Sequence, residues 1–200
     1  MRTEILVQGE KLEVYIQGEP LPQDKKAIAI VGSRKMSDRG RILAWDFSYE
    51  LAKNKFTIIS GLAVGIDTVA HTAALAAGGR TIAVLAHGID RIYPPENALL
   101  ANKITKNGYL ITKFKPGTAP YPRNFLLRNQ LVAGLSKGVL IIEGKLPSGT
   151  LSTASHAANL NLDVFAIPGS PLTNELIKDG AIEVNKPQDI LDYLNSTYSQ

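Results

Sequence analysis

Short apolar runs alternate along this chain with amphipathic segments and glycine-containing turns, and this alternation constrains the fold more than any other feature. Six of the runs are rich in Ile, Val, Leu or Ala and have the composition of buried strands. They lie at Ala27–Gly32, Phe56–Ser60, Thr81–Ala86, Tyr109–Lys113, Gly138–Glu143 and Val164–Pro168. Strands that alternate with helices are typical of a parallel sheet, so the sequence predicts a doubly wound α/β domain.

The segments between these runs have the length and periodicity of helices that cover the two faces of such a sheet. We predict helices at Asp38–Ala52, Ile66–Ala77, Glu96–Lys106, Asn124–Leu135, Thr150–Leu160 and, after a turn marked by proline, Lys186–Leu194. The β-like start of the chain predicts a short hairpin or extended arm. The predicted organisation is therefore an N-terminal arm or hairpin at 1–25, a main domain at 26–185, and a C-terminal helix and tail at 186–200.

Composition narrows the class of protein. The chain of 200 residues contains no cysteine, which excludes disulfides, thiolate metal sites and a cysteine nucleophile. This fits a reducing compartment, so we expect the cytoplasm. No apolar run approaches the ~18 residues of a membrane span, so no membrane partner is expected. Lysine and arginine exceed aspartate and glutamate by 22 to 18, and this net charge of +4 permits nucleic-acid binding without requiring it.

The first predicted strand ends in a loop suited to binding an anion. In doubly wound α/β domains ligands bind beyond the carboxyl ends of the strands, where loops and helix N-termini converge. Gly32 there permits a close backbone approach, Ser33 offers a hydroxyl, and Arg34 supplies a forked cation suited to phosphate. The simpler interpretation is an ordinary strand-to-helix turn with a solvated arginine.

The second loop, from Ser60 to Asp67, brackets a tight turn with Gly61 and Gly65. It lacks the lysine of a Walker A loop. The loop after the first strand does not complete the G-x-G-x-x-G dinucleotide fingerprint, and the second strand ends in Ser60 instead of the acidic residue that would hold a ribose. NAD binding is therefore not expected. Asp67 and His71 lie four residues apart and form either an acid–base pair or, more simply, a capping or helix-surface pair.

A third segment combines basic, amide and aromatic side chains, and it comprises Arg123, Asn124, Phe125, Arg128 and Asn129. Phe125 can stack on a base while the arginines bind phosphates, or it can anchor this helix in the core. Arg128 and Asn129 follow it at helical offsets and share its end of the helix.

Two further features are weaker. Ser148, Gly149 and Thr150 form a second potential anion cradle, although Ser148 can simply cap the helix that begins there. His87 and His156 lack partners at metal-ligand spacing, so we expect packing or surface roles for them and no metal site.

The order of these motifs resembles the DprA/Smf family of bacterial DNA-processing proteins. The resemblance covers most of residues 26–181 and includes IAIVGSR (28–34), IISGLAVGIDTVAH (58–71), PGTAPYPRNFLLRN (116–129) and VFAIPGS (164–170). It implies an extended Rossmann-like domain that binds single-stranded DNA, commonly as a homodimer, and helps to load the RecA recombinase during natural transformation. It implies no catalytic residue and no cofactor. Many members carry additional helical and winged-helix domains, and from the chain length we expect the central domain without them.

The resemblance also implies which residues contact DNA. The side chains that would line the bound DNA strand are those of Ser33, Arg34, Asn124, Phe125, Arg128 and Asn129. Gly32 and Gly61 would shape the pocket. Arg123 adds a phosphate-binding cation. Gln130 stands where relatives usually have arginine, and Lys113, at a commonly acidic position, restores positive charge nearby. Little sequence preference is expected, because arginines would hold phosphates and Phe125 would offer a stacking face.

Two alternatives remain open from the residues. One is an enzyme that resembles the N-glycosidic phosphoribohydrolases, in which Glu143 would stabilise an oxocarbenium-like sugar; the chain lacks the Pro-Gly-Gly phosphate loop expected of that group. The other is a nucleotide sensor that has kept the fold and lost polymer binding.

Overall fold

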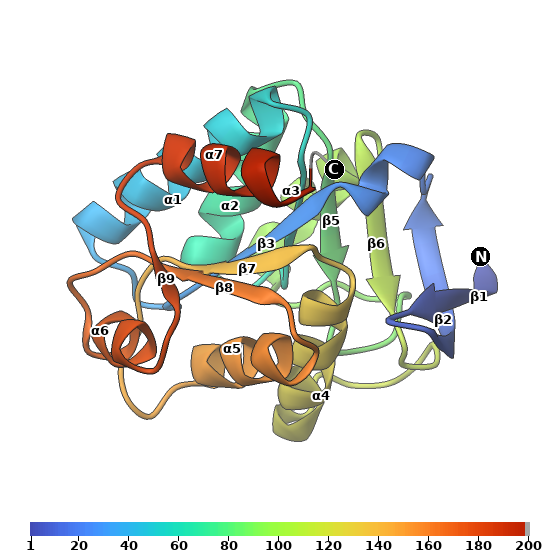
Figure 1. Ribbon diagram of the computed structural model, residues 1–200. Helices are drawn as coiled ribbons and strands as arrows, with labels where there is room; N and C mark the ends of the chain where they lie inside the picture. Colours follow the sequence, from blue (N-terminus) through green and yellow to red (C-terminus); the bar gives the residue numbers. More distant parts are fainter. Residues whose placement is uncertain (199–200) are drawn as a thin grey trace.

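A nine-stranded sheet runs through the structure, a computed structural model that describes residues 1–198 (Figure 1). The strands lie in the order β1-β2-β6-β5-β4-β3-β7-β8-β9. All strands from β3 to β9 pair in parallel, whereas the hairpin β1–β2 joins the sheet through an antiparallel pairing of β2 with β6. Their bounds are β1 Arg2–Val7, β2 Glu10–Gly18, β3 Ala27–Val31, β4 Thr57–Ser60, β5 Thr81–Val84, β6 Gly108–Thr112, β7 Gly138–Ile141, β8 Asp163–Ala166 and β9 Ile182–Glu183.

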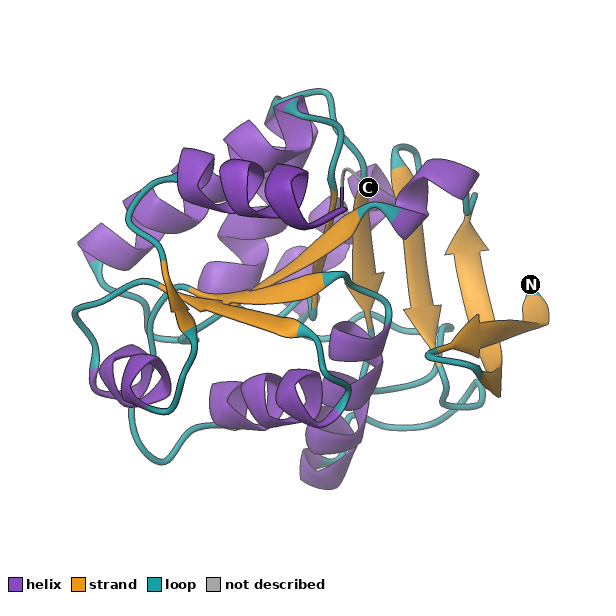
Figure 2. Cartoon of the chain, viewed as in Figure 1, coloured by secondary structure: helices purple, strands orange, loops and turns teal. Residues whose placement is uncertain are grey.

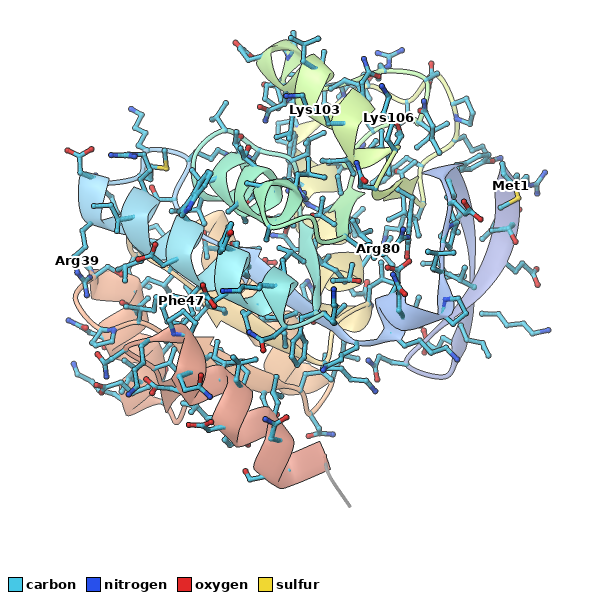
Figure 3. All side chains as sticks on the ribbon, turned by 90° about the horizontal axis from the view of Figure 1, so that it is seen from above. Met1, Arg39, Phe47, Arg80, Lys103 and Lys106 are labelled. Carbon is cyan, nitrogen blue, oxygen red and sulfur yellow. The ribbon has the colours of Figure 1, made fainter. Side chains whose placement is uncertain are left out.

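Helices cover both faces of this sheet (Figures 1 and 2). One face carries α1 (Asp38–Lys53), α2 (Ile66–Ala76), α3 (Ala98–Ile104) and α7 (Pro187–Tyr198), and Figure 3 is viewed from that side. The opposite face carries α4 (Pro122–Gly134), α5 (Gly149–Asn159) and α6 (Pro171–Lys178). Two short 3-10 turns, Pro22–Lys25 and Pro95–Asn97, precede β3 and α3. The predicted doubly wound α/β class is confirmed.

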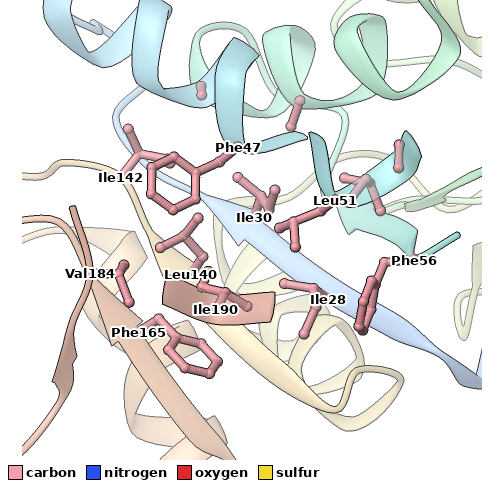
Figure 4. Close-up of a cluster of buried hydrophobic side chains, with 14 of the residues drawn as sticks. Ile28, Ile30, Phe47, Leu51, Phe56, Leu140, Ile142, Phe165, Val184 and Ile190 are labelled. Carbon is pink, nitrogen blue, oxygen red and sulfur yellow. The ribbon is translucent and has the colours of Figure 1, made fainter. Parts of the chain in front are cut away.

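The position of β3 in the middle of the sheet, with helices on both faces, explains why its sequence is apolar at every position. Ile28 and Ile30 point into the cluster formed with α1 and α7, where Phe47 and Phe165 fill the space (Figure 4). Ala27, Ala29 and Val31 belong to the cluster on the other face, beneath α4 and α5. A parallel strand covered by helices on both sides has no solvent-facing side chains, so the usual apolar–polar alternation is absent.

The connections create a crevice between β3 and β7. From β3 to β6 the chain adds each new parallel strand on the same side, and α4 then carries it back to β7 on the other side of β3. At such a switch point the loops that follow the two strands diverge, and ligands of open α/β sheets bind there. The loops that follow β3 and β7 are the ones from which Ser33, Arg34, Ser148 and Gly149 come.

The predicted strands are correct in position but several are too long. The strand predicted at Gly138–Glu143 ends at Ile141, and the one predicted at Val164–Pro168 ends at Ala166, because the residues beyond turn into the loops that shape the crevice. Strand β9 and helix α6 are not predicted. Helix α6 has a start signal in Ser170, whose side chain accepts from the backbone N–H of Thr173, followed by a proline at the first helical position.

The ends of the chain were predicted less completely. The hairpin β1–β2 is part of the main sheet, and α7 extends beyond the predicted Leu194 to Tyr198. Residues 199–200 of the predicted tail lie outside the described residues. The division of the chain at residues 25 and 185 stays a prediction.

Asp24 fastens the segment before β3 to the sheet. It is 8% exposed, and its carboxylate accepts from Arg80 Nε at 2.7 Å, Arg80 Nη2 at 2.8 Å and Thr57 Oγ1 at 2.9 Å. Removing one partner of a mostly buried ion pair leaves the other partner, here Arg80, without its counter-charge. Asp24→Ala is therefore expected to lower the free energy of unfolding by about 2 kcal/mol. Urea unfolding measures this change.

A matched control for that substitution is Glu50→Ala, which removes an exposed ion pair of 3.8 Å with Lys53. Exposed pairs contribute little, so a loss of about 0.5 kcal/mol or less is expected. Equal losses in the two variants would contradict the role of Asp24 as an anchor.

Candidate nucleic-acid interface

An open pocket of about 720 Å³ lies at the carboxyl edge of the sheet, in the crevice between β3 and β7. Its walls come from the loops after β3, β4 and β7, from Tyr93, from one side of α4, and from the starts of α2 and α5. Of the sequence-predicted residues, the pocket brings together Gly32, Ser33, Arg34, Gly61, Phe125, Arg128 and Asn129. Four segments far apart in the sequence therefore meet at one place.

The loop after β3 is packed too tightly for a larger residue at its start. A Cβ on Gly32 would lie 2.7 Å from Cγ1 of Ile66, at the start of α2. The hydroxyl of Ser33 accepts from the backbone N–H of Lys35 at 3.1 Å, which shapes the turn. Arg34 is exposed and lines the pocket, so its guanidinium is available to a ligand.

Phe125 is half-buried and faces the pocket, which rules against its interpretation as a core anchor. Its ring centroid lies 4.9 Å from the guanidinium carbon of Arg34 and 6.0 Å from that of Arg128. Tyr93 packs edge-on against it at 6.0 Å between ring centroids. An aromatic ring thus lies close to two cations, with a second aromatic side chain beside it.

Arg128 differs from Arg34 because it is only 5% exposed. Its Nη1 donates to the carbonyl of Val84 at 2.8 Å, and its Nε is buried without a partner among residues 1–198. Burial lowers the pKa of Arg128, and the Asp67 carboxylate opposes this shift. Arginine side chains stay protonated in proteins, so this shift does not remove the charge. Arg128 is a fixed charge in the floor of the pocket.

Asp67 and His71 are both buried, so their interpretation as a helix-surface pair is wrong. Asp67 accepts from the backbone N–H of Gly61 at 3.1 Å and of Ala63 at 3.3 Å, which fixes the loop after β4. Burial raises the pKa of Asp67, while Arg128 and these N–H groups lower it. Asp67 therefore has a capping role and is also the counter-charge of Arg128.

His71 plays no acid–base role at the pocket. Thr81 Oγ1 donates to the carbonyl of Ile58 at 2.7 Å, so it accepts from His71 Nδ1 across 2.6 Å. Burial, aided by the charge of Arg128, lowers the pKa of His71 to about 3. The ring is consequently neutral and serves to pack α2 against β5.

Three predicted residues are not brought to the pocket. Asn124 is buried and its side chain donates to the carbonyl of Ala119 at 3.3 Å, whereas Arg123 is exposed on another side of α4. Helical geometry turns the two residues directly before Phe125 away from the side that Phe125, Arg128 and Asn129 share. Lys113 follows β6, three strands from β3, and burial lowers its pKa.

The loop between β7 and α5 contributes residues that were only partly predicted. Lys145, Ser148, Gly149 and Thr150 line the pocket at the start of α5. Ser148 makes no capping hydrogen bond through its side chain, and its Oγ is buried without a partner in the described part of the chain. Asn129 Nδ2 donates to the carbonyl of Gly149 at 3.0 Å and ties α4 to this helix start. The positive end of α5 faces the pocket.

Glu143 is held elsewhere. Its carboxylate accepts from Ser37 N–H at 2.8 Å and from Ser37 Oγ at 2.6 Å, at the start of α1. A Cβ on Gly40 would lie 2.4 Å from its carboxyl carbon, so this glycine makes room for it. The carboxylate stabilises the positive end of α1, and it is not among the pocket residues that would contact a sugar.

The pocket is positively charged. Arg34, Lys35, Lys145 and Arg128 line it, and Asp67 is the acidic residue among the lining side chains. Within residues 1–198 no three His, Asp or Glu side chains are grouped in a way that could hold a metal ion. No helix in that same range is long and apolar enough to span a membrane. The arrangement is suited to an anion with an aromatic or planar part.

Comparison with known proteins agrees with this geometry. The family model described as DNA recombination-mediator protein A matches residues 6–195. The Smf protein of Escherichia coli is 42% identical over 189 residues, which cover 90% of this chain and 50% of that protein. The chain spans about half the length of the curated relatives it matches, from 44% to 60%.

Solved structures extend the comparison. The X-ray structure of DNA processing protein A from Streptococcus pneumoniae matches with a TM-score of 0.84 and 40% identity, over 90% of this chain and 65% of that one. A second match is the Helicobacter pylori DNA processing protein A, whose structure concerns its single-stranded DNA binding mode. It gives a TM-score of 0.85 and 31% identity over 93% of this chain and 88% of that one.

Proposed function

The chain belongs to the DNA recombination-mediator protein A family, and on this premise we propose that it binds single-stranded DNA in the pocket as a non-catalytic recombination mediator. The resemblance to the DprA/Smf family is thereby confirmed. The Helicobacter pylori relative, which binds single-stranded DNA, supports the choice of ligand.

One observation carries the proposal: the Phe125 ring lies at an open pocket with the guanidinium groups of Arg34 and Arg128 at 4.9 and 6.0 Å from its centroid. Stacking of a base on an aromatic ring is tolerant of sequence because every base has a π-face. Guanidinium groups close to the ring bind the phosphates that flank such a base. These side chains contact the face of a base and the phosphates, and these contacts do not distinguish one base from another. Binding is therefore expected to show little sequence preference.

Other residues support this assignment. Lys35 and Lys145 add positive charge at the rim, and the N-terminus of α5 offers backbone N–H groups to a further phosphate. The phosphoribohydrolase-like alternative loses its support, because Glu143 is bound at the start of α1. We therefore propose binding without catalysis.

The activity of the whole protein is a separate matter. Loading of RecA, a role in natural transformation and a homodimer are expectations from the family, and we retain them as proposals. The pocket residues are local to this chain and can be tested on it directly.

Arg34→Ala is expected to weaken the binding of a labelled ~20-nucleotide single strand about tenfold, because one phosphate contact and one side of the stacking site are lost. With ~3 phosphates engaged, the wild-type log–log salt slope should lie near −2, and the variant should lose about 0.7 of that slope. Fluorescence anisotropy at several salt concentrations measures both quantities.

Arg123→Ala is the matched control, since this arginine is exposed on the same helix but does not line the pocket. Equal loss of binding in the two variants would remove the pocket assignment. Competition by a mononucleotide as effective as by the strand would instead favour the nucleotide-sensor interpretation.

A further inference from the structure

A second basic surface lies at the opposite edge of the sheet, where the parallel strands begin. In five neighbouring strands a cation stands one or two residues before the first strand residue. In the order of the sheet these are Lys106 before β6, Arg80 before β5, Lys55 before β4, Lys26 before β3 and Lys137 before β7. We call these five residues the amino edge.

Backbone hydrogen bonds show that the strand starts are aligned. Lys137 N–H donates to the carbonyl of Ala27 at 2.8 Å, and Thr57 N–H donates to that of Lys26 at 2.8 Å. Ile58 N–H donates to the carbonyl of Arg80 at 3.0 Å. With neighbouring strands about 4.8 Å apart, the row from β6 to β7 is roughly 19 Å long.

The amino edge is remote from the pocket. Figure 3 places Arg80 and Lys106 on one side of the molecule and Arg39, at the start of α1, on the other. The pocket lies at the carboxyl ends of the same strands, beside the start of α1. The four or five residues of each strand, together with the loops, separate the two surfaces.

Four of the five cations are available to a ligand. Lys26, Lys55, Lys106 and Lys137 are exposed and form no salt bridge within residues 1–198. The ammonium of Lys26 lies over the ring of Phe56 at 4.2 Å, which limits its movement. Arg80 is occupied by Asp24.

The acidic residues near this row are Glu19, Asp24, Asp163 and Glu50. Glu19 is exposed, and its backbone carbonyl accepts from Arg80 Nη2 at 2.7 Å. Asp24 is neutralised by Arg80, and Asp163, which pairs with Gly138 across β7 and β8, accepts from the hydroxyl of Tyr193. The carboxyl end of α1 adds Glu50, which lies 3.8 Å from Lys53. Lysines near helix C-termini also stabilise those helices, and this role leaves their ammonium groups in solvent.

The chemistry of the row indicates its ligand. The lysine ammonium is a strongly hydrated point charge, which is suited to phosphate. It lacks the rigid pair of donors by which an arginine guanidinium recognises a base edge. Phe56, the aromatic residue beside Lys26, is buried and offers no stacking face. A row of such charges fits the backbone of a nucleic acid and carries no sequence preference.

We propose that the amino edge is a second site for the phosphate backbone of single-stranded DNA, used by strands long enough to extend from the occupied pocket around the molecule. The inference rests on the proposed function, since the pocket holds one part of the strand. A strand of a few nucleotides fills the pocket alone, whereas a long strand contacts both surfaces.

The test compares a ~6-nucleotide with a ~40-nucleotide single strand on wild type and on the triple variant Lys26→Gln, Lys55→Gln, Lys137→Gln. Loss of about three phosphate contacts should weaken binding of the long DNA strand roughly tenfold. It should also reduce the log–log salt slope of that binding by about 2. The short strand should bind as it does to wild type. Circular dichroism and thermal unfolding confirm that the variant is folded.

A control variant separates a local site from total charge. Lys11→Gln, Lys178→Gln and Lys186→Gln remove three exposed lysines outside the amino edge and lower the net charge equally. Equal weakening by the two triple variants, or an unchanged long strand in the amino-edge variant, would overturn the proposal. A preference of the amino edge for duplex DNA over the single strand would also overturn it.

The outcome for the pocket is read independently. Arg34→Ala should weaken both the short and the long strand if the proposed function holds. If Arg34→Ala changes neither while the amino-edge variant loses the long strand, the pocket function fails and the amino edge stands as a binding surface on its own.

Discussion

Arg128→Ala is expected to lower the free energy of unfolding by about 3 to 5 kcal/mol and to abolish binding of single-stranded DNA in the pocket. Arg128 is 5% exposed, and its guanidinium interacts electrostatically with the buried carboxylate of Asp67. Its removal leaves that carboxylate without its counter-charge and opens a void beside Gly61. Urea unfolding measures the first effect and fluorescence anisotropy the second.

The double variant Arg128→Ala with Asp67→Asn separates these two effects. An amide at position 67 carries no charge, so the double variant should recover a large part of the lost stability. It should not recover DNA binding, because the fixed cation is still missing. A double variant no more stable than Arg128→Ala would contradict the pairing of Arg128 with Asp67.

Arg34 and Arg128 have different roles in the structure. Both were predicted as phosphate-binding cations, since the sequence places each in a basic segment after or near a strand. The structure separates them: Arg34 is exposed, whereas Arg128 is buried, bonds to Val84 at the end of β5 and packs closely against Gly61 in the loop after β4. Arg34→Ala is therefore the clean test of binding, and Arg128→Ala tests binding and folding together.

The fold was largely predictable because a buried parallel sheet leaves a strong local pattern. The apolar runs from β3 to β8 are bounded by glycine, polar residues or proline, and each was located to within two or three residues at either end. The misses have local causes. Strand β9 has two residues, too few for a periodic pattern, and α6 has eight, so only its capping signal announces it.

The pocket was predictable in part for the same reason. Loops after parallel strands gather at one edge, so Gly32 to Arg34 and Gly61 could be placed together from the sequence. Helical offsets also group Phe125, Arg128 and Asn129 on one side of α4, and the structure brings these three to the pocket. The offsets did not lead us to separate Asn124 from this group, and only the structure shows that Asn124 is buried against Ala119 while Asn129 reaches Gly149.

Gly61→Ala is expected to weaken binding of single-stranded DNA at least tenfold and to destabilise the protein by about 2 kcal/mol. A Cβ at this position would lie 1.5 Å from Nη1 and 2.1 Å from Cζ of Arg128. The methyl group and the guanidinium cannot occupy the same space, so Arg128 must leave its bond to Val84 and its place in the pocket floor. Anisotropy titration and urea unfolding measure the two losses.

Gly149→Ala provides the control, because this glycine also lines the pocket but a Cβ there meets no atom within 4 Å. It opens helix α5, where alanine is the better helix former, so stability should be unchanged or slightly raised. The pair of variants adds one methyl group to the same pocket in two places. If Gly61→Ala bound DNA as well as Gly149→Ala does, a fixed Arg128 would not be needed for binding, and the exposed cations of the rim would have to account for it.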